Sequence, residues 1–284
     1  MLHRPATLAL ILLLTATLAA CAGRRTPPPD DALEQPEQLF EAMIARLDAV
    51  QAVRARAVME YYGAGGRVRV RQTVLAAQPN LLRIDTLSPF DSTLSVVFAN
   101  DRELVLYDLP NEAWYTGAPT ATNLARLIPV WLSPQDVVSV LLGGPPLDRI
   151  VPDASRWTLD WDRRRGAYRF TAPTRGGDTL VLFVTHGAWT VVGAQELDAA
   201  ERVRWEIRSA DFSTVHAGDV ATTVPGILRF LMKSENIDVS LNVSSYELNP
   251  TLGPTLFQLP VPPGVRVFPL DAVEPVELAE PPAE

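Results

Sequence analysis

Few side chains in this chain of 284 residues have the types and spacing that covalent chemistry requires. The two histidines of its main body, His186 and His216, are 30 positions apart and have no cysteine or carboxylate at metal-ligand spacing. Asp160 and Asp162 alternate on an expected strand, and we expect both to face water, unlike a catalytic carboxylate pair. No Gly-x-Ser-x-Gly sequence is present. The sequence therefore predicts neither an enzyme active site nor a metal site.

Cysteine occurs once, as Cys21, and its position gives the thiol a specific chemistry. A disulfide within one molecule is excluded because there is no second cysteine. His3 and Arg4 precede an apolar run from Ala6 to Leu18, which has the length of a signal-peptide core and is shorter than the ~18 residues of a membrane-spanning helix. The sequence Leu18-Ala-Ala-Cys21 resembles the lipoprotein box of bacterial export signals.

The resemblance to the lipoprotein box implies a lipid anchor. Residues 1–20 are then a signal peptide, and Cys21 carries a covalent diacylglycerol and an N-acyl chain, with no other cofactor. Each buried methylene contributes about 0.8 kcal/mol, so two or three acyl chains hold a protein at a membrane where one does not. Ala22 stands where retained inner-membrane lipoproteins have aspartate, which implies the outer membrane, on its periplasmic side. The alternative is an ordinary signal peptide followed by a chance cysteine.

Charge and composition narrow the class of protein further. The chain from Cys21 onward has 24 basic residues (25 less Arg4) and 33 acidic ones, a net charge of −9. This balance argues against nucleic acid as a partner and against a polybasic membrane-binding surface. We predict a flexible tether at 21–35, which contains TPPPDD, a single domain at 36–268, and a disordered acidic, proline-rich tail at 269–284.

Hydrophobic periodicity predicts a mainly β domain. A helix is expected from Pro36, because Leu39, Met43 and Leu47 recur on one face. After it the period changes to two, which is typical of antiparallel strands with one wet and one dry face. The expected strands lie in 67–74, 81–87, 93–99, 103–108, 112–117, 157–162, 167–172, 179–185, 189–197, 201–209 and 236–244.

The segment at 122–146, TNLARLIPVWLSPQDVVSVLLGGPP, breaks this pattern and predicts two apolar helices. Pro129 kinks or ends the first helix. Ser133 is the expected cap of the second helix, with Asp136 three residues later and Gly143 as its stop. Helices with so little polar surface must be buried, and the dry face of the sheet is the available partner.

About 11 strands with three helices favour a curved antiparallel sheet around an apolar hollow, within a mainly β (α+β) class. In this arrangement the apolar mid-chain helix pair plugs the hollow of a barrel. The alternative is a two-layer sandwich whose faces fill each other, and composition does not decide between them. The apolar helix pair favours the barrel because a sandwich does not need it.

Several stretches together resemble the outer-membrane lipoprotein-sorting family of the carrier LolA and the anchored acceptor LolB. QPNLLRID at 78–85, VFANDRELVLYD at 97–108 and LFQLPVPPGV at 256–265 are similar to motifs of the family's strands and closing segment. SPFDSTL at 88–94 and the helix pair with its Leu-Gly-Gly-Pro end are closer to the acceptor branch.

The family resemblance implies a function and assigns two residues to it. It implies an incomplete antiparallel β-barrel with the mid-chain helix pair as a lid. In this picture the protein is a monomer that holds acyl chains of lipoproteins or lipids in its apolar cavity and receives them from a soluble periplasmic carrier. Phe90 stands where acceptors have a leucine that projects into the membrane, so it marks a membrane-transfer loop, although Asp91 beside it resists deep insertion. The alternative for Phe90 is a turn residue folded back on the core. Gln78 stands where carriers have an arginine that bonds to the lid, so that latch is not expected here.

Alternation along the strands supplies the remaining site predictions. Nine side chains are expected to line the acyl-chain cavity: Leu82, Ile84, Leu94, Val96, Leu104, Leu106, Val203, Trp205 and Ile207. Four are expected in the lid: Leu127, Trp131, Val138 and Leu141. Each of the nine has simple core packing as its alternative role. For the whole protein the alternative is a non-enzymatic structural or assembly lipoprotein of the same fold with a filled cavity.

Overall fold

A computed structural model describes residues 25–63, 66–218 and 220–272. Within them the chain builds one 14-stranded sheet of order β14-β6-β5-β4-β3-β2-β1-β13-β12-β11-β10-β9-β8-β7. The pair β14–β6 is parallel, and the other neighbouring strands are antiparallel. The edges of the sheet are β7 and β14, so the sheet is open.

The strands are β1 (Ala52–Gly63), β2 (Gly66–Ala77), β3 (Leu81–Leu87), β4 (Thr93–Ala99), β5 (Leu104–Asp108), β6 (Ala113–Gly117), β7 (Thr158–Asp162), β8 (Ala167–Pro173), β9 (Thr179–Val184), β10 (Val191–Leu197), β11 (Val203–Ala217), β12 (Val220–Met232), β13 (Ile237–Leu248) and β14 (Arg266–Pro269). The helices are α2 (Pro36–Asp48), α3 (Ala121–Leu127) and α4 (Pro134–Leu141). Short 3₁₀ turns are η1 (Leu147–Arg149), η2 (Ala154–Arg156), η3 (Lys233–Glu235), η4 (Pro254–Phe257) and η5 (Leu270–Ala272).

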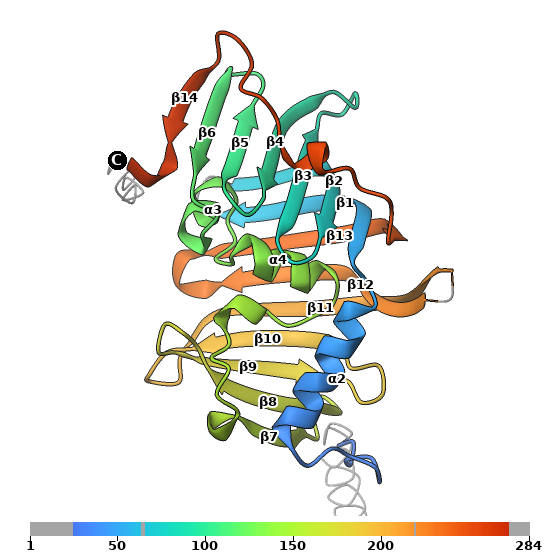
Figure 1. The fold of residues 1–284 in the computed structure, drawn as a ribbon. Coiled ribbons are helices and arrows are strands. Elements are labelled where there is room, and N and C mark those ends of the chain that lie inside the picture. The colour runs from blue at the N-terminus through green and yellow to red at the C-terminus, as the bar shows by residue number, and fades with distance from the viewer. Residues whose placement is uncertain (1–24, 64–65, 219, 273–284) are drawn as a thin grey trace, which may run out of the picture.

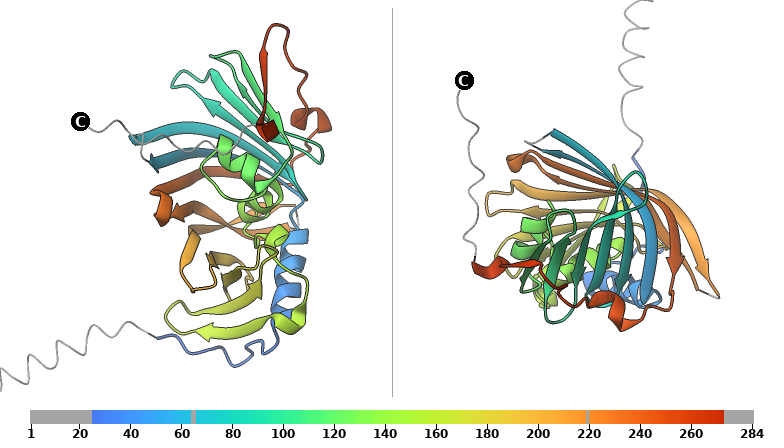
Figure 2. Two further views of the ribbon diagram at one scale, coloured as in Figure 1. Left: turned by 90° about the vertical axis from the view of Figure 1, so that its left-hand side faces the viewer. Right: turned by 90° about the horizontal axis from the view of Figure 1, so that it is seen from above.

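All three helices lie on one face of the sheet, and the sheet curves around them (Figures 1 and 2). Helix α2 crosses the half of the sheet that ends at β7, whereas α4 packs on β2, β3 and β12. Helix α2 is amphipathic, as the spacing of its apolar residues predicts, and buries Leu39, Met43 and Leu47.

Buried side chains form three clusters. The first core joins α4 and Leu124 of α3 to β1–β5, and the second core joins α2 to β8–β13. A third, smaller cluster of Val96, Phe98, Val105 and Trp114 lies on the opposite face of β4–β6, where Leu259 and Val265 of the C-terminal segment cover it. Strand β4 is therefore buried on both faces.

The structure differs from the sequence predictions at three points. For the described residues the mainly β class and the three helices are confirmed, but the sheet, which is open, has 14 strands rather than about 11. The residues counted as tether include Thr26 and Leu33, which hydrogen-bond to the sheet. The residues counted as tail begin with Pro269 in β14 and Leu270, which is 5% exposed. The signal peptide, Cys21 and residues 273–284 lie outside the described residues.

No helix in the described part of the chain is long and apolar enough to cross a membrane.

Candidate functional site

An apolar cavity of about 120 Å³ lies where the first and second cores meet. Its floor is the helix-bearing face of the central strands, and its cover is the segment from Ile128 to Leu141. Of the 17 lining residues, 15 are apolar, the exceptions being Gln72 and Arg229. The lining consists of Met59, Gln72, Val74, Ile84, Ile128, Pro129, Val130, Leu132, Val137, Val140, Leu141, Ile207, Leu228, Arg229, Phe230, Val239 and Leu241.

The cavity is a consequence of how α4 sits between the two cores. Val137 and Val140 pack against both clusters, and these short side chains leave the junction incompletely filled. An engineered cavity of about 150 Å³ with apolar walls admits one benzene molecule. The space of about 120 Å³ therefore suits a hydrocarbon group of roughly that size, and a complete acyl chain requires the cover to move.

The cover and helix α3 before it, which together we call the lid (residues 121–141), have well-defined ends. Thr120 accepts a hydrogen bond from the Asn123 amide at 3.2 Å and caps α3. Ser133 and Asp136 form the capping box of α4 that the sequence predicts. Gly143 ends α4 with a φ of +75°, a conformation that favours glycine. Between the helices, 128–132 supplies apolar side chains to the cavity.

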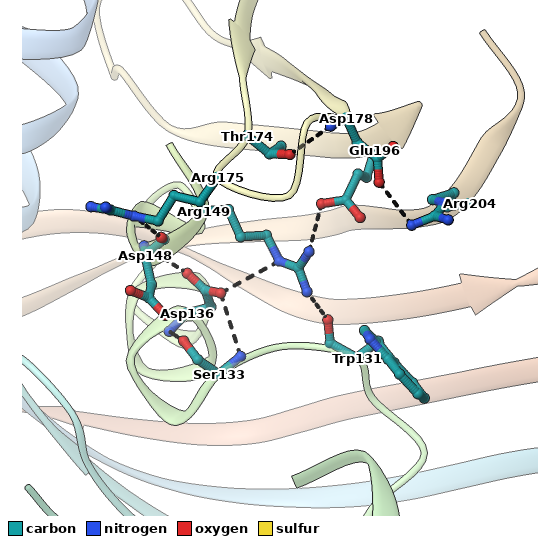
Figure 3. A network of polar contacts seen from close by, with 10 residues as sticks. All are labelled: Trp131, Ser133, Asp136, Asp148, Arg149, Thr174, Arg175, Asp178, Glu196 and Arg204. Atoms are coloured by element: carbon teal, nitrogen blue, oxygen red, sulfur yellow. Dashed lines mark hydrogen bonds and ion pairs between the residues drawn. The ribbon is translucent and has the colours of Figure 1, made fainter. Parts of the chain in front are cut away.

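A buried polar network holds the lid to the second half of the sheet (Figure 3). Its centre is Arg149, whose Nη1 donates to Glu196 Oε2 of β10 at 2.5 Å and whose Nη2 donates to the backbone oxygen of Trp131 in the lid. Arg149 Nε lies 3.5 Å from Asp136 Oδ2 in α4, and the guanidinium is 5.1 Å from the Trp205 ring centroid. Arg149 thus connects two points of the lid to β10 and β11.

Asp136 is the most deeply buried charge of this network, with a side chain only 2% exposed. Its Oδ1 accepts from the Asp148 amide at 2.9 Å, and its Oδ2 accepts from the Ser133 amide at 3.4 Å. Burial raises the pKa of Asp136 to about 6, although the Arg149 charge and the two amides act in the opposite direction. The carboxyl group therefore titrates in the range where lid anchoring can respond to pH.

A second tie holds the other end of the lid. Arg46 of α2 donates from Nη1 to the Leu142 backbone oxygen at 3.0 Å and from Nη2 to the Thr223 backbone oxygen of β12. Burial lowers the pKa of Arg46 to about 10.

Gln78 does not reach the lid. Its Nε2 donates to the Leu47 and Val50 backbone oxygens at 2.8 and 2.7 Å, at the end of α2.

The structure brings only part of the predicted cavity set together. Ile84 and Ile207 line the cavity. Four others are packed in cores: Leu82, Leu104 and Leu106 in or against the first core and Trp205 in the second. The remaining three predictions were wrong, because Leu94 and Val203 are exposed and Val96 belongs to the cluster on the opposite face.

The lid predictions divide in a similar way. Leu141 covers the cavity, whereas Val138 is fully buried in the first core and Leu127 packs against that core. The Trp131 side chain is 39% exposed and is absent from the apolar lining, while its backbone oxygen accepts from Arg149. The neighbours Val130 and Leu132 supply the lining instead.

Sequence reasoning missed most of the lining, although a signal was present for some of it. Val239 and Leu241 alternate in the same strand pattern that gave Ile207, and both line the cavity. Val137 and Val140 lie on α4 three residues apart, on the stripe that faces the sheet. No sequence pattern identified Arg149 or Glu196, because both contact their partners across long sequence separations.

Phe90 is the most exposed large apolar side chain among the described residues, at 90%. It lies at the tip of the β3–β4 loop, which Arg71 of β2 fixes by donating to the Ser88 and Pro89 backbone oxygens at 2.9 and 2.7 Å. Arg71 also pairs with Asp91 at 2.9 Å, so that the acid beside Phe90 has a cation next to it. Phe90 is therefore presented outward and is not folded back on the core.

The other residues with chemical potential have structural surroundings. His186 lies 3.3 Å from Asp31 and 3.1 Å from the Tyr168 hydroxyl, and His216 is exposed on β11. Asp162 accepts from the Arg164 and Arg165 amides and shapes the β7–β8 turn. No group of three or more His, Cys, Asp or Glu side chains within 25–272, its gaps aside, is arranged to hold a metal ion.

No protein-family model matches the sequence, and no curated protein sequence matches it. Solved structures do match the fold. A DUF1329 family protein from Desulfovibrio piger has a TM-score of 0.59 and 12% identity, over 80% of this chain and 98% of that one. A putative outer membrane lipoprotein-sorting protein domain from Vibrio parahaemolyticus has a TM-score of 0.57 and 10% identity, over 78% and 97%.

A LolA superfamily protein from Nitrosomonas europaea aligns over the same shares, 78% and 97%, at 10% identity and a TM-score of 0.49. The identities of the first two matches show a common architecture and nothing finer. This chain therefore shares its fold with a DUF1329 family protein and with a lipoprotein-sorting protein domain.

Proposed function

We propose that this protein is an outer-membrane lipoprotein, anchored through Cys21 on the periplasmic side, that binds acyl chains of lipoproteins or lipids and acts in lipoprotein localisation or envelope biogenesis. The observation that carries the proposal is the apolar cavity between the two cores, covered on one side by a lid that hydrogen bonds and ion pairs hold in place. The fold shared with a lipoprotein-sorting protein domain supports it.

The energetics of transfer explain why such a cavity is useful. An acyl chain of about 15 methylenes gains roughly 12 kcal/mol on leaving water, at about 0.8 kcal/mol for each. A receptor must offer most of this free energy to keep the cargo from aggregating, and less than the bilayer offers. Transfer from a soluble carrier to this protein and then to the membrane needs no ATP if each step is downhill.

Phe90 and the lid have separate roles in this proposal. Phe90, held outward by Arg71, is the contact of the acceptor-like transfer loop, as the resemblance to the LolB branch implies. The lid moves to admit the chain, because the cavity of about 120 Å³ holds only a small hydrocarbon group. The free energy of ligand binding is then the free energy gained by burying the acyl chain less the free energy needed to move the lid.

Binding of a fluorophore-labelled fatty acid tests the proposal. Ile207→Trp fills the cavity and should weaken binding by about tenfold or more, roughly 1.4 kcal/mol. Val203→Trp is the matched control, since Val203 lies on the same strand and is 44% exposed. Equal binding by both variants would contradict the cavity as the site, and thermal unfolding of both separates this effect from overpacking.

A structural or assembly lipoprotein with a filled interior is the second candidate, and the small volume of the cavity favours it. Purification from the native envelope followed by lipid mass spectrometry distinguishes the two. A chain that carries no non-covalent lipid and excludes the labelled fatty acid is a scaffold.

A further inference from the structure

The first described residues are fixed to the hairpin formed by β7 and β8. The Thr26 amide donates to the Arg163 backbone oxygen at 2.8 Å, and Trp161 Nε1 donates to the Thr26 backbone oxygen at 3.0 Å. Farther along, the Leu33 amide donates to the Tyr168 hydroxyl at 2.8 Å. The chain thus enters the folded body at the hairpin turn and runs from there to α2 (Figures 1 and 2).

The hairpin turn has the sequence Asp162-Arg-Arg-Arg-Gly166. The side chains of two of its arginines make no polar contact with the described part of the chain. Asp162 Oδ1 accepts from the Arg164 amide at 2.8 Å, and Gly166 has a φ of +61°, so the turn has a defined shape. Arg165 pairs with Asp162 at 2.8 Å and lies over the Phe183 ring. Arg163 and Arg164 are exposed, and neither side chain has an ion-pair or hydrogen-bond partner among residues 25–63, 66–218 and 220–272.

Arg25 adds a third exposed guanidinium beside the turn, because it directly precedes Thr26. We call Arg25, Arg163 and Arg164 the arginine tip. A chain whose net charge is −8 has here a local concentration of positive charge. Asp30 and Asp31 are the nearest acids on the entering segment, and Asp31 is placed against His186 at 3.3 Å.

The arginine tip lies close to the expected lipid anchor on covalent grounds. Five peptide steps separate Cys21 from Thr26, and at roughly 3.6 Å each they span at most about 18 Å. If Cys21 is acylated, the tip is held near the headgroup layer, and the entering segment cannot carry it far away. Arginines at a membrane surface each strengthen attachment to anionic lipid, by about fivefold for each residue.

We propose that the arginine tip is a membrane-facing surface that binds the anionic phosphates of phospholipid headgroups and orients the body on its own bilayer. The proposal rests on the lipid anchor of the proposed function and adds an orientation to it. The β7 edge then faces the bilayer, and the β3–β4 hairpin with Phe90 lies at the other end of the molecule (Figure 1). Phe90 is thereby available to a carrier that arrives from the periplasm.

The test uses the acylated full chain in vesicles of phosphatidylcholine with or without phosphatidylglycerol. A cysteine introduced by Asp160→Cys, on the exposed side of β7, carries a fluorophore, and Asp101→Cys in the β4–β5 turn marks the remote end. Nitroxide-labelled headgroups quench whichever fluorophore lies near the bilayer. We expect strong quenching at position 160 and weak quenching at position 101 when phosphatidylglycerol is present.

Charge removal completes the test. The double change Arg163→Gln with Arg164→Gln should reduce quenching at position 160 to the level seen without phosphatidylglycerol, and about 1 M salt should do the same. Arg102→Gln, another exposed turn arginine, should change nothing. Equal quenching at both positions would overturn the orientation. Quenching at position 160 that is the same with and without the two arginines would also overturn it. A protein mass without acyl groups would instead overturn the anchor, so the two failures can be told apart.

Discussion

Arg149 Nη1 lies 2.5 Å from Glu196 Oε2, and this contact joins the segment after the lid to β10. The same guanidinium reaches the Trp131 backbone oxygen and Asp136 in the lid. A single side chain therefore connects two points of the lid to the second half of the sheet, in addition to the Arg46 contacts at the other end. The acids that it contacts are almost fully buried, at 2% exposed for Asp136 and 6% for Glu196.

Replacing Arg149 by methionine should loosen the lid. Removal of Arg149 leaves the buried Asp136 and Glu196 carboxyl groups without their cation, which costs about 3–5 kcal/mol in the free energy of unfolding. Since the lid is then held mainly at its Arg46 end, we also expect faster uptake of the labelled fatty acid in stopped-flow mixing. Arg102→Met is the exposed control. Unchanged uptake with reduced stability would show that Arg149 is structural and not a latch.

The raised pKa of Asp136 predicts a pH dependence of stability. In the unfolded chain this carboxyl group titrates near 3.8, and in the folded protein near 6. Its contribution to stability is fully present below pH 3.8 and is lost as the pH rises through about 6. The loss is on the order of 3 kcal/mol, at about 1.4 kcal/mol for each unit of pKa.

Urea unfolding of the wild type and of Asp136→Asn measures this effect. The difference in the free energy of unfolding, wild type minus variant, should fall between about pH 4 and pH 7. Other acids such as Asp198, whose pKa is lowered chiefly by the hydrogen bond from the Arg202 backbone amide, cancel in that difference. A pH-independent difference would mean that Asp136 keeps its ordinary pKa in the folded protein.

How far the sequence predicts this molecule depends on the range of the interactions. Predictions from neighbouring residues are confirmed. The capping box forms at Ser133 and Asp136, and α4 stops at Gly143, as the residue types indicate. Alternation also worked where one face is dry and the other wet, as for Ile84 and Ile207. These features depend on residues within one turn or one strand of each other.

Alternation failed on β4, where Val96 was assigned to the cavity. The sequence TLSVVFA is apolar on both faces, because the C-terminal segment covers the second face with Leu259 and Val265. The strand itself does not indicate which of its two apolar faces lines the cavity, because the cover of the second face comes from a segment more than 150 residues later. The network around Arg149 was missed for the same reason, since Glu196 lies 47 positions away.

Phe90 supplies a prediction that separates function from stability. Because the side chain is 90% exposed, Phe90→Glu should leave the midpoint of thermal unfolding unchanged. We expect the same change to slow transfer of labelled cargo from donor vesicles or a carrier, while equilibrium binding of free fatty acid is retained. Arg71→Gln removes the support of the loop and should show a smaller effect in the same direction. If the Phe90→Glu variant transfers cargo at the normal rate, the β3–β4 loop has no role in transfer.

The C-terminal turn predicts an effect on the lid from residues that the sequence assigns to a tail. Asp271 Oδ1 accepts from Asn123 Nδ2 of α3 at 2.6 Å, and Asp271 Oδ2 accepts from the Ala118 amide at 3.0 Å. Leu270 packs into the first core, and its backbone oxygen accepts from Arg126. These contacts fasten the start of the lid to the sheet.

A chain that ends at Pro269 should therefore lose about 1.5–3 kcal/mol of stability from Leu270 alone. It should also exchange the amide hydrogens of α3 faster than the full chain, because Asn123 and Arg126 lose their acceptors at Asp271 and Leu270. A chain that ends at Ala272 retains both residues and is the matched control. If the two truncated chains unfold at the same urea concentration and protect the α3 amides equally, the turn does not support the lid, because the contacts of Leu270 and Asp271 then contribute nothing that either measurement detects.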